Sequence, residues 1–406
     1  MESRKKRRES RISRQKRLLL PKSLSYLTPI QIAQHIKLHV KTIEGPITVS
    51  LLIPNDTLKE DLGRDGPVIL LLGDIHVGEQ KCANCRIKDG CYSLYNESDN
   101  GTSTLMNWID RFSRRFKVST DFFIENWVDV SLRGQHEGIW ADHVDGSALP
   151  EIAYLSAPCT TKQRTNCPFP HIRTHFTDIR HNYDTYKADN LNILRSYLLR
   201  TNTLSDLTSQ FPLVRKFARD NLKEYLEFMF PDFSFESILQ SYIDVLSFQR
   251  KHFFDNPFFQ RHSRAYHEWI QLPKKVRNEI RTSILFYGFT DDEEHVQMEE
   301  NMPKLIAFLS HLQKDSFTER IVKDRARTSK DVFDLLTLLV DNPFSSFCIE
   351  LYTICRMLKD FEKGLPSQLS VVYEGFFHTR NILFTLKNYY TMNVYAADDS
   401  KCIHLH

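Results

Sequence analysis

Apolar residues recur along this chain with two different periods, and each period predicts a type of element. Short, nearly unbroken apolar runs at 47–53, 68–72, 121–128 and 370–374 have the length and composition of buried strands. The run at 105–116 instead repeats its apolar residues every three to four positions, as an amphipathic helix does. The order of strand, helix and strand predicts a βαβ unit, with parallel strands joined by a right-handed crossover.

The second half of the chain has a different pattern. From about 184 to 365 the apolar spacing is almost wholly helical and glycine is nearly absent, after which strand, helix and strand return at 370–374, 379–391 and 393–397. We therefore predict an α/β fold: a mostly parallel sheet with flanking helices, interrupted by a long all-helical insertion. The predicted division is a basic disordered tail at 1–22, a first part of the α/β domain with cysteine-bearing loops at 23–183, a helical insertion or cap at 184–365, and the last part of the α/β domain at 366–406.

Charge is distributed unevenly. The net charge is +3, but residues 1–17 hold nine Lys/Arg against two Glu, which leaves +7 there and −4 on the rest of the chain. The basic residues at 4–17 are too charged to collapse; they could serve nuclear import, contact nucleic acid or an acidic partner, or only act as a solubilising arm. No apolar run approaches the ~20 residues that span a bilayer. We expect a soluble intracellular protein, with nuclear and virion-associated locations as candidates.

Two of the predicted strands end in the same motif, Gly-x-x-His, at 73–76 and at 375–378. Ligands bind outside the carboxyl ends of strands in open α/β sheets, so a histidine placed there is a site candidate. One such motif is a weak signal, since a lone histidine in that place is more often structural. The repetition predicts two strands that deliver His76 and His378 to one crevice.

Further polar residues follow the same strand ends. Asp74 lies inside the first motif, and Glu125 interrupts the third apolar strand, where a carboxylate is costly unless it is paired or functional. Arg380 comes directly after the second motif, at the start of a helix. A later loop adds Asp178 and Arg180, which are either a structural pair or a site where Arg180 holds a substrate carboxylate, a phosphate or an oxyanion.

Two kinds of chemistry fit these residues. Two imidazoles and a carboxylate suit a divalent metal with an open coordination position, held by His76, His378 and Glu125. They equally suit a metal-free site in which His or Glu takes a proton from water.

The pattern of these motifs resembles the TraB/Tiki, ChaN and erythromycin-esterase-like superfamily, over residues 66–130 and 368–392. The resemblance implies a peptidase-like or esterase-like hydrolase with His76, Glu125 and His378 as its central catalytic or metal-binding residues. Asp74 departs from the pattern, because the family has Glu in Gly-Glu-x-His. The superfamily is divided among metal-dependent, metal-independent and haem-binding members, so the resemblance implies a hydrolytic site more than a metal. The chain also resembles uncharacterised proteins of large DNA viruses.

Five of the eight cysteines form two groups near this predicted site: Cys82, Cys85 and Cys91, then Cys159 and Cys167. The Cys-x-x-Cys spacing is that of a zinc knuckle, and the second group would complete a tetrahedral structural zinc site. Disulfides in an oxidising environment and reduced thiols are the alternatives.

Taken together, these features predict a hydrolase whose active site consists of two Gly-x-x-His histidines and a strand-end Glu, acting on a small molecule or a peptide. The alternative is a non-enzymatic binding protein, viral or virion-associated, that retains the fold and contacts nucleic acid or another acidic partner through its tail.

Overall fold

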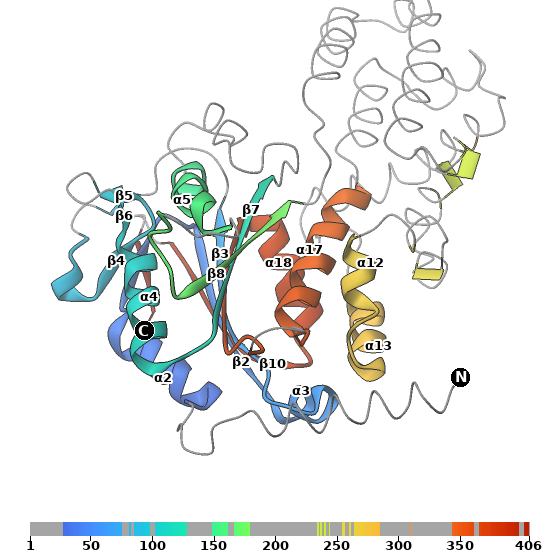
Figure 1. The fold of residues 1–406 in the computed structure, drawn as a ribbon, viewed down its shortest axis with the longest axis horizontal. Helices are drawn as coiled ribbons and strands as arrows, with labels where there is room; N and C mark the ends of the chain where they lie inside the picture. Colours follow the sequence, from blue (N-terminus) through green and yellow to red (C-terminus); the bar gives the residue numbers. More distant parts are fainter. Residues whose placement is uncertain are drawn as a thin grey trace, which may run out of the picture.

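The structure is a computed structural model (Figure 1). It describes residues 27–74, 81–82, 85–97, 102–127, 148–160, 166–178, 264–284, 343–360, 365–397 and 402–405, with a few further residues between 234 and 310. The basic segment at 4–17 and the predicted tail at 1–22 lie outside the described residues. Within the described part of the chain, no helix is both long enough and apolar enough to cross a membrane.

A six-stranded sheet in the order β10-β2-β3-β9-β7-β8 forms the centre of the fold (Figure 1). Its strands are β2 (Thr48–Pro54), β3 (Val68–Asp74), β7 (Thr120–Trp127), β8 (Ile172–Asp178), β9 (Leu369–Gly375) and β10 (Tyr390–Ala396). The strands β3, β9, β7 and β8 are parallel neighbours, whereas β2 is antiparallel to both β3 and β10. The α/β prediction is confirmed in this coarse form, but the sheet is mixed rather than mostly parallel.

The reversal at β2 has a local cause. The connection from β2 to β3 holds only the seven-residue helix α3 (Asp56–Leu62), which is capped by the Asn55 side chain at its start and by Gly63 at its end. Parallel neighbours need a crossover long enough to return along the whole strand. Here the chain turns back at the same edge of the sheet, and β3 pairs with β2 in the opposite direction.

Helices cover both faces of the sheet (Figure 1). On one face Ile32, Leu105 and Ile152 pack with Leu70 and Val371 in one apolar core. On the other face α18 contacts β3 and β9, α17 contacts α18, and α12 contacts α17. The helices of the first face are α2 (Pro29–His39), α4 (Thr104–Phe116) and α5 (Ala148–Ser156), and those of the second are α12 (Arg264–Trp269), α13 (Lys274–Ser283), α17 (Pro343–Leu358) and α18 (Phe376–Leu386).

A small second sheet, in the order β11-β1-β4, lies beside the first core. Ile43 and Ile403 are both fully buried at its centre. Its strands are β1 (Thr42–Glu44), β4 (Cys91–Ser93) and β11 (Cys402–His404), and two short strands, β5 (Asn96–Glu97) and β6 (Thr102–Ser103), pair separately. This sheet brings the C-terminal strand next to the segment that follows β3.

Alternation along β9 decides which polar residues can meet. Tyr373 belongs to the core on the α2 and α4 face. Its neighbour Glu374 pairs with Gly73 in the register of β9 and β3, and both therefore point to the opposite face. That face is the one that α17 and α18 cover, so a carboxylate there meets α17, which was expected to belong to a separate insertion.

The predicted domain boundaries stay a prediction. Of the proposed insertion at 184–365, the structure describes chiefly α12, α13 and α17, and each of these is helical as expected.

Candidate active site at the carboxyl ends of the parallel strands

The first turn of α18 places His378 at the end of the central strand. The helix starts at Phe376, directly after β9, with Gly375 as its N-cap residue. A close approach to β3 fixes its position: a Cβ added to Gly73 would lie 2.7 Å from Thr379 Oγ1 and 2.4 Å from Thr48 Oγ1. The glycine of the first Gly-x-x-His motif is therefore needed so that the helix carrying the second histidine can pack against its strand.

Glu125 enters the same region through an irregularity in β7. The register of β7 against β8 shifts between Ile124 and Trp127. Such bulges re-aim side chains and are common beside active sites. At this point the Glu125 carboxylate accepts a hydrogen bond of 2.7 Å from the Gly375 N–H at the start of α18. The partial positive charge of a helix N-terminus favours an anion in this place.

The imidazole of His378 lies between two carboxylates. Its Nε2 is 3.4 Å from Glu125 Oε1, and its Nδ1 is 3.0 Å from Glu350 Oε1. The predicted contact between His378 and Glu125 is thus present, while Glu350 comes from α17, where no site residue was expected. The side chains of His378 and Glu125 are 12% and 9% exposed, against 2% for Glu350, so the carboxylate near Nε2 is the more accessible of the two.

Electrostatics favour the charged form of this histidine. Burial alone would lower the pKa of His378, but the carboxylates of Glu125 and Glu350 outweigh it and raise the pKa well above its ordinary value of 6.5. Both ring nitrogens then carry protons, and each donates toward one carboxylate. The site holds an imidazolium at neutral pH.

Glu350 is itself fixed by a second partner. Asn381, one turn after His378 in α18, donates from Nδ2 to Glu350 Oε1 over 2.6 Å. Burial raises the pKa of Glu350, and the nearby imidazolium opposes that effect. The carboxylate oxygen is thus shared between an imidazole and an amide, a geometry that holds the ring at one orientation.

A second buried carboxyl group lies on the same face. Glu374 is fully buried, and its Oε1 accepts a hydrogen bond of 2.8 Å from Thr353 Oγ1 of α17. Its Oε2 has no hydrogen-bond partner among the described residues. Burial, with a further contribution from the charge of Glu125, raises the pKa of Glu374 from 4.5 to about 7. This group changes its charge in the neutral pH range.

Asp74 lies apart from this cluster. It accepts a hydrogen bond of 3.0 Å from Tyr373 Oη. Because Asp74 is one residue beyond Gly73, it points to the α2 and α4 face, the opposite face from Glu125 and Glu374. Strand alternation therefore separates the two acidic residues that the sequence analysis had placed together.

The remaining predicted residues are distributed as follows. Arg380 is half-buried two positions after His378 on α18, a spacing that places the two side chains on different sides of a helix. The side chain of Asp178, at the end of β8, is not among those the structure describes. His76 and Arg180 lie outside the described residues, so their predicted roles stay predictions.

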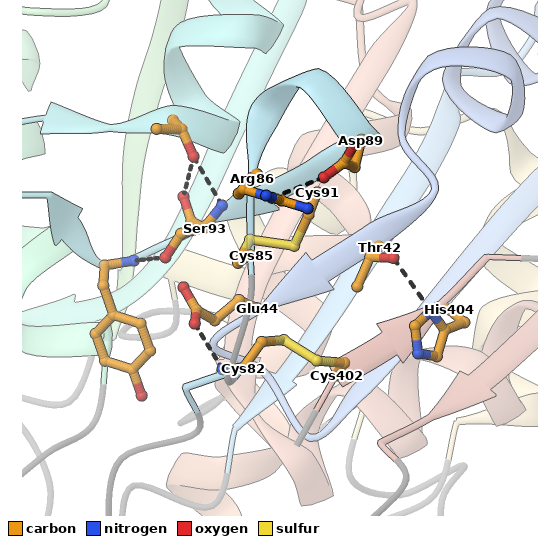
Figure 2. The surroundings of a disulfide bond; sticks show 12 residues. Thr42, Glu44, Cys82, Cys85, Arg86, Asp89, Cys91, Ser93, Cys402 and His404 are labelled. Atoms are coloured by element: carbon orange, nitrogen blue, oxygen red, sulfur yellow. Dashed lines mark hydrogen bonds and ion pairs between the residues drawn. A yellow bond between two sulfur atoms is a disulfide. The ribbon is translucent and has the colours of Figure 1, made fainter. Parts of the chain in front are cut away.

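The predicted zinc site at the cysteines is wrong. Six of the eight cysteines pair as disulfides, Cys82 with Cys402, Cys85 with Cys91, and Cys159 with Cys167. Figure 2 shows the first two pairs side by side at the small sheet, where the Cys82 N–H also donates to Glu44 Oε1 over 2.6 Å. A Cys-x-x-Cys spacing is compatible with either arrangement, and the partner of Cys82 is Cys402 of β11, which lies outside the two groups named from the sequence.

The metal predicted at the histidine and glutamate site finds no support in the described residues, and its predicted ligand His76 lies outside them. Among the residues that the structure describes, no group of three or more His, Cys, Asp or Glu side chains could hold a metal ion. At His378 each ring nitrogen faces a carboxylate, Nε2 toward Glu125 and Nδ1 toward Glu350. The metal-free alternative is the one that fits this geometry.

Two site residues were missed from the sequence. Glu374 has the same signal as Glu125, an acidic residue near the end of an apolar strand, and the same argument would have found it. Glu350 lies within an apolar helical run at 349–358, where a single acidic residue would be assigned to the solvent-exposed side of the helix. Only the packing of α17 against α18 reveals its role.

Comparisons of the chain with family models, with curated proteins and with solved structures return no match. The resemblance to the TraB/Tiki and erythromycin-esterase-like superfamily therefore stays a prediction from the motifs.

Proposed function

We propose that this protein is a hydrolase in which Glu125 and His378 act together as general base and general acid, without a metal. The observation that carries the proposal is the arrangement of the His378 ring. Glu350 holds Nδ1 from the buried side, while Nε2 faces the partly exposed Glu125 at 3.4 Å, longer than a well-formed hydrogen bond. A substrate or a water molecule placed beside this pair would contact both groups.

The proposed reaction keeps every proton within this pair. Glu125 takes a proton from water as the water oxygen attacks the carbonyl carbon of an ester or amide. His378 donates its Nε2 proton to the leaving oxygen or nitrogen as the bond to carbon breaks. The proton on Glu125 then passes to His378 Nε2, and both groups return to their starting forms. Positioned acid–base groups of this kind contribute about 10²- to 10⁴-fold each.

Three further features support an active site over a structural ion pair. The strand bulge at Glu125, the position at the carboxyl ends of parallel strands, and the buried carboxyl of Glu374 with its pKa of about 7 are each typical of functional sites. In this proposal Glu374 loses its proton as the pH passes neutrality, and its charge then helps to keep His378 protonated. The resemblance stated above also implies His76 as a catalytic residue, and Arg180 stays the candidate for holding a substrate carboxylate, a phosphate or an oxyanion.

The test is turnover by the purified chain with its disulfides intact. The substrates would be p-nitrophenyl acetate and butyrate, for esterase activity, and a mixture of quenched fluorescent peptides, for peptidase activity. We expect Glu125→Gln and His378→Asn each to lose at least about a hundredfold in kcat/KM. His404→Asn and Glu60→Gln are the matched controls, since both side chains are exposed and lie outside the site. Absence of turnover by the wild type on both substrate classes, or full activity of Glu125→Gln, would refute the proposal.

The disulfides support a proposal about the environment as well. Protein disulfides persist where the surroundings are oxidising and are rare in the reducing cytosol and nucleus. We infer that the protein works in an oxidising compartment or in a particle that has left the cell. Alkylation of free thiols in intact source material, followed by non-reducing peptide mapping, should recover Cys159 linked to Cys167. Recovery of both cysteines in alkylated form would contradict the inference.

A further inference from the structure

Helix α17 presents three polar residues to ionisable groups of the sheet and of α18. Glu350, Thr353 and Arg356 follow one another at intervals of three residues, so they lie along one side of the helix. Their partners are His378, Glu374 and His175 respectively, at 3.0, 2.8 and 3.1 Å. The contacts come from three different elements, α18, β9 and β8, which makes α17 the common support of the titrating groups.

The third contact shows how this helix selects a tautomer. A guanidinium only donates, so Arg356 Nη2 fixes Nδ1 of His175 as an acceptor. The ring proton of His175 is then on Nε2, which donates to Asp121 Oδ1 over 2.7 Å. Burial lowers the pKa of His175, although the Asp121 carboxylate opposes that effect. Here α17 keeps an imidazole neutral.

At His378 the same helix contributes the opposite kind of group. Glu350 Oε1 accepts, so Nδ1 of His378 must carry a proton, and Asn381 holds the carboxylate in place with a hydrogen bond of 2.6 Å. We propose that Glu350 is a positioning residue: it holds the Nδ1–H of His378 so that Nε2 keeps a proton to donate on the Glu125 side. The contribution of this role to catalysis rests on the proposed function, whereas its effect on the imidazole does not.

Several charged or polar groups surround His378, and they must be separated in any test. Glu125 approaches from β7 and Glu350 from α17, and the charge of Glu374 on β9 also acts on the ring. On its own helix α18, Arg380 lies two residues after His378, and Asn381 donates a hydrogen bond to Glu350. Of the two carboxylates that contact the ring, Glu350 is almost completely buried and doubly held, whereas Glu125 is the one that must exchange partners during turnover.

The experiment measures the protonation of His378 directly. Proton and nitrogen NMR of protein labelled with 15N-histidine gives the tautomer and titration of each of the 16 histidines, and His378→Asn assigns the signal. In Glu350→Gln the amide oxygen can still accept from Nδ1, but the charge is gone. We expect the pKa of His378 to fall by about one unit or more, a tenfold loss in proton affinity. In Glu350→Asp the charge remains, and most of the wild-type value should be kept.

A matched control separates this effect from loosening of the helix. Glu268 of α12 binds Arg356 on α17 and Lys359 directly after that helix, but does not touch the site. In Glu268→Gln the titration of His378 should stay within about 0.3 units of the wild type. An unchanged titration in Glu350→Gln, or an equal fall in Glu268→Gln, would overturn the proposal.

Kinetics then distinguish a failure of this inference from a failure of the proposed function. If the wild type hydrolyses an ester or peptide, the alkaline limb of its pH profile should move to lower pH in Glu350→Gln, by the same shift that NMR reports. An unmoved profile in an active enzyme would refute the positioning role alone. If no substrate is turned over but the NMR shift is found, the proposed hydrolase fails and the role of Glu350 toward His378 stands.

Discussion

Glu374→Gln should remove a pH dependence of stability that the wild type carries. The ordinary pKa of this carboxyl is 4.5 and its pKa in the folded chain is about 7. The folded state therefore holds the proton more tightly than the unfolded state. The stability that Glu374 gains from holding this proton in the folded state is fully present below about pH 4.5. It is lost as the pH rises through about 7. At 1.36 kcal/mol for each unit of pKa, the complete loss is about 3 kcal/mol.

The assay is urea denaturation of wild type and variant at pH 5, 6, 7 and 8, without reductant. Glutamine keeps the acceptor for Thr353 and carries no charge, so the free energy of unfolding of the variant should rise relative to the wild type by about 2 to 3 kcal/mol between pH 5 and pH 8. The pKa of about 7 already includes the opposing attraction between Glu374 and the imidazolium of His378. Glu60→Gln, at an exposed position of α3, should show no trend. A difference that is constant across the pH range would refute the reasoning.

Three further substitutions test the contacts that hold the structure around the site, each by the same urea denaturation assay. Asp121→Asn should cost about 3 to 5 kcal/mol, because this buried carboxylate is the counter-charge of the Arg173 guanidinium and also accepts the hydrogen bond from His175 Nε2. Gly73→Ala should cost about 1 to 3 kcal/mol, since the new methyl group meets Thr379 Oγ1 at 2.7 Å. A Cys82→Ser/Cys402→Ser variant should lose up to about 5 kcal/mol, because this disulfide joins residues 320 apart.

These predictions have their own controls. Asp360→Asn removes an exposed partner of Arg64 and should cost under about 1 kcal/mol. The disulfide between Cys159 and Cys167 joins residues only 8 apart, and its removal should cost about 3 kcal/mol less than removal of the long-range one. Equal losses for the two disulfides would contradict the loop-entropy argument, and an unaffected Gly73→Ala would mean that the first turn of α18 can move away.

Local pattern predicted the elements of the sheet better than their directions. The apolar runs at 68–72 and 370–374 became β3 and β9, and the amphipathic run at 105–116 became α4. Strand direction depends on pairing between residues far apart in sequence, and the reversed strand β2 has the same apolar composition as its parallel neighbours. Nothing in the composition of a buried strand records which way it runs.

The candidate site was predictable where it depends on strand ends, and unpredictable where it depends on packing. The contact between His378 and Glu125 follows from two strands whose carboxyl ends share an edge. The exclusion of Asp74 follows from alternation, once the register of β3 and β9 is known. Glu350 reaches His378 only because α17 packs against α18, and the hydrophobic periodicity of the sequence does not predict which helices pack together.

Glu374 offers a test between a hydrolase and a scaffold that merely retains the fold. A scaffold gains nothing from a carboxyl group that is fully buried, has no hydrogen-bond partner for Oε2 in the part of the chain that the structure describes, and costs the fold about 3 kcal/mol above neutral pH. In a scaffold Glu374→Gln should therefore be more stable at pH 8 and otherwise unchanged. In a hydrolase the same variant should gain that stability and lose activity above pH 7, because His378 would then release its proton more readily. Stability and turnover measured on this one variant at pH 8 decide between the two. A gain in stability without a loss of activity would count against the hydrolase.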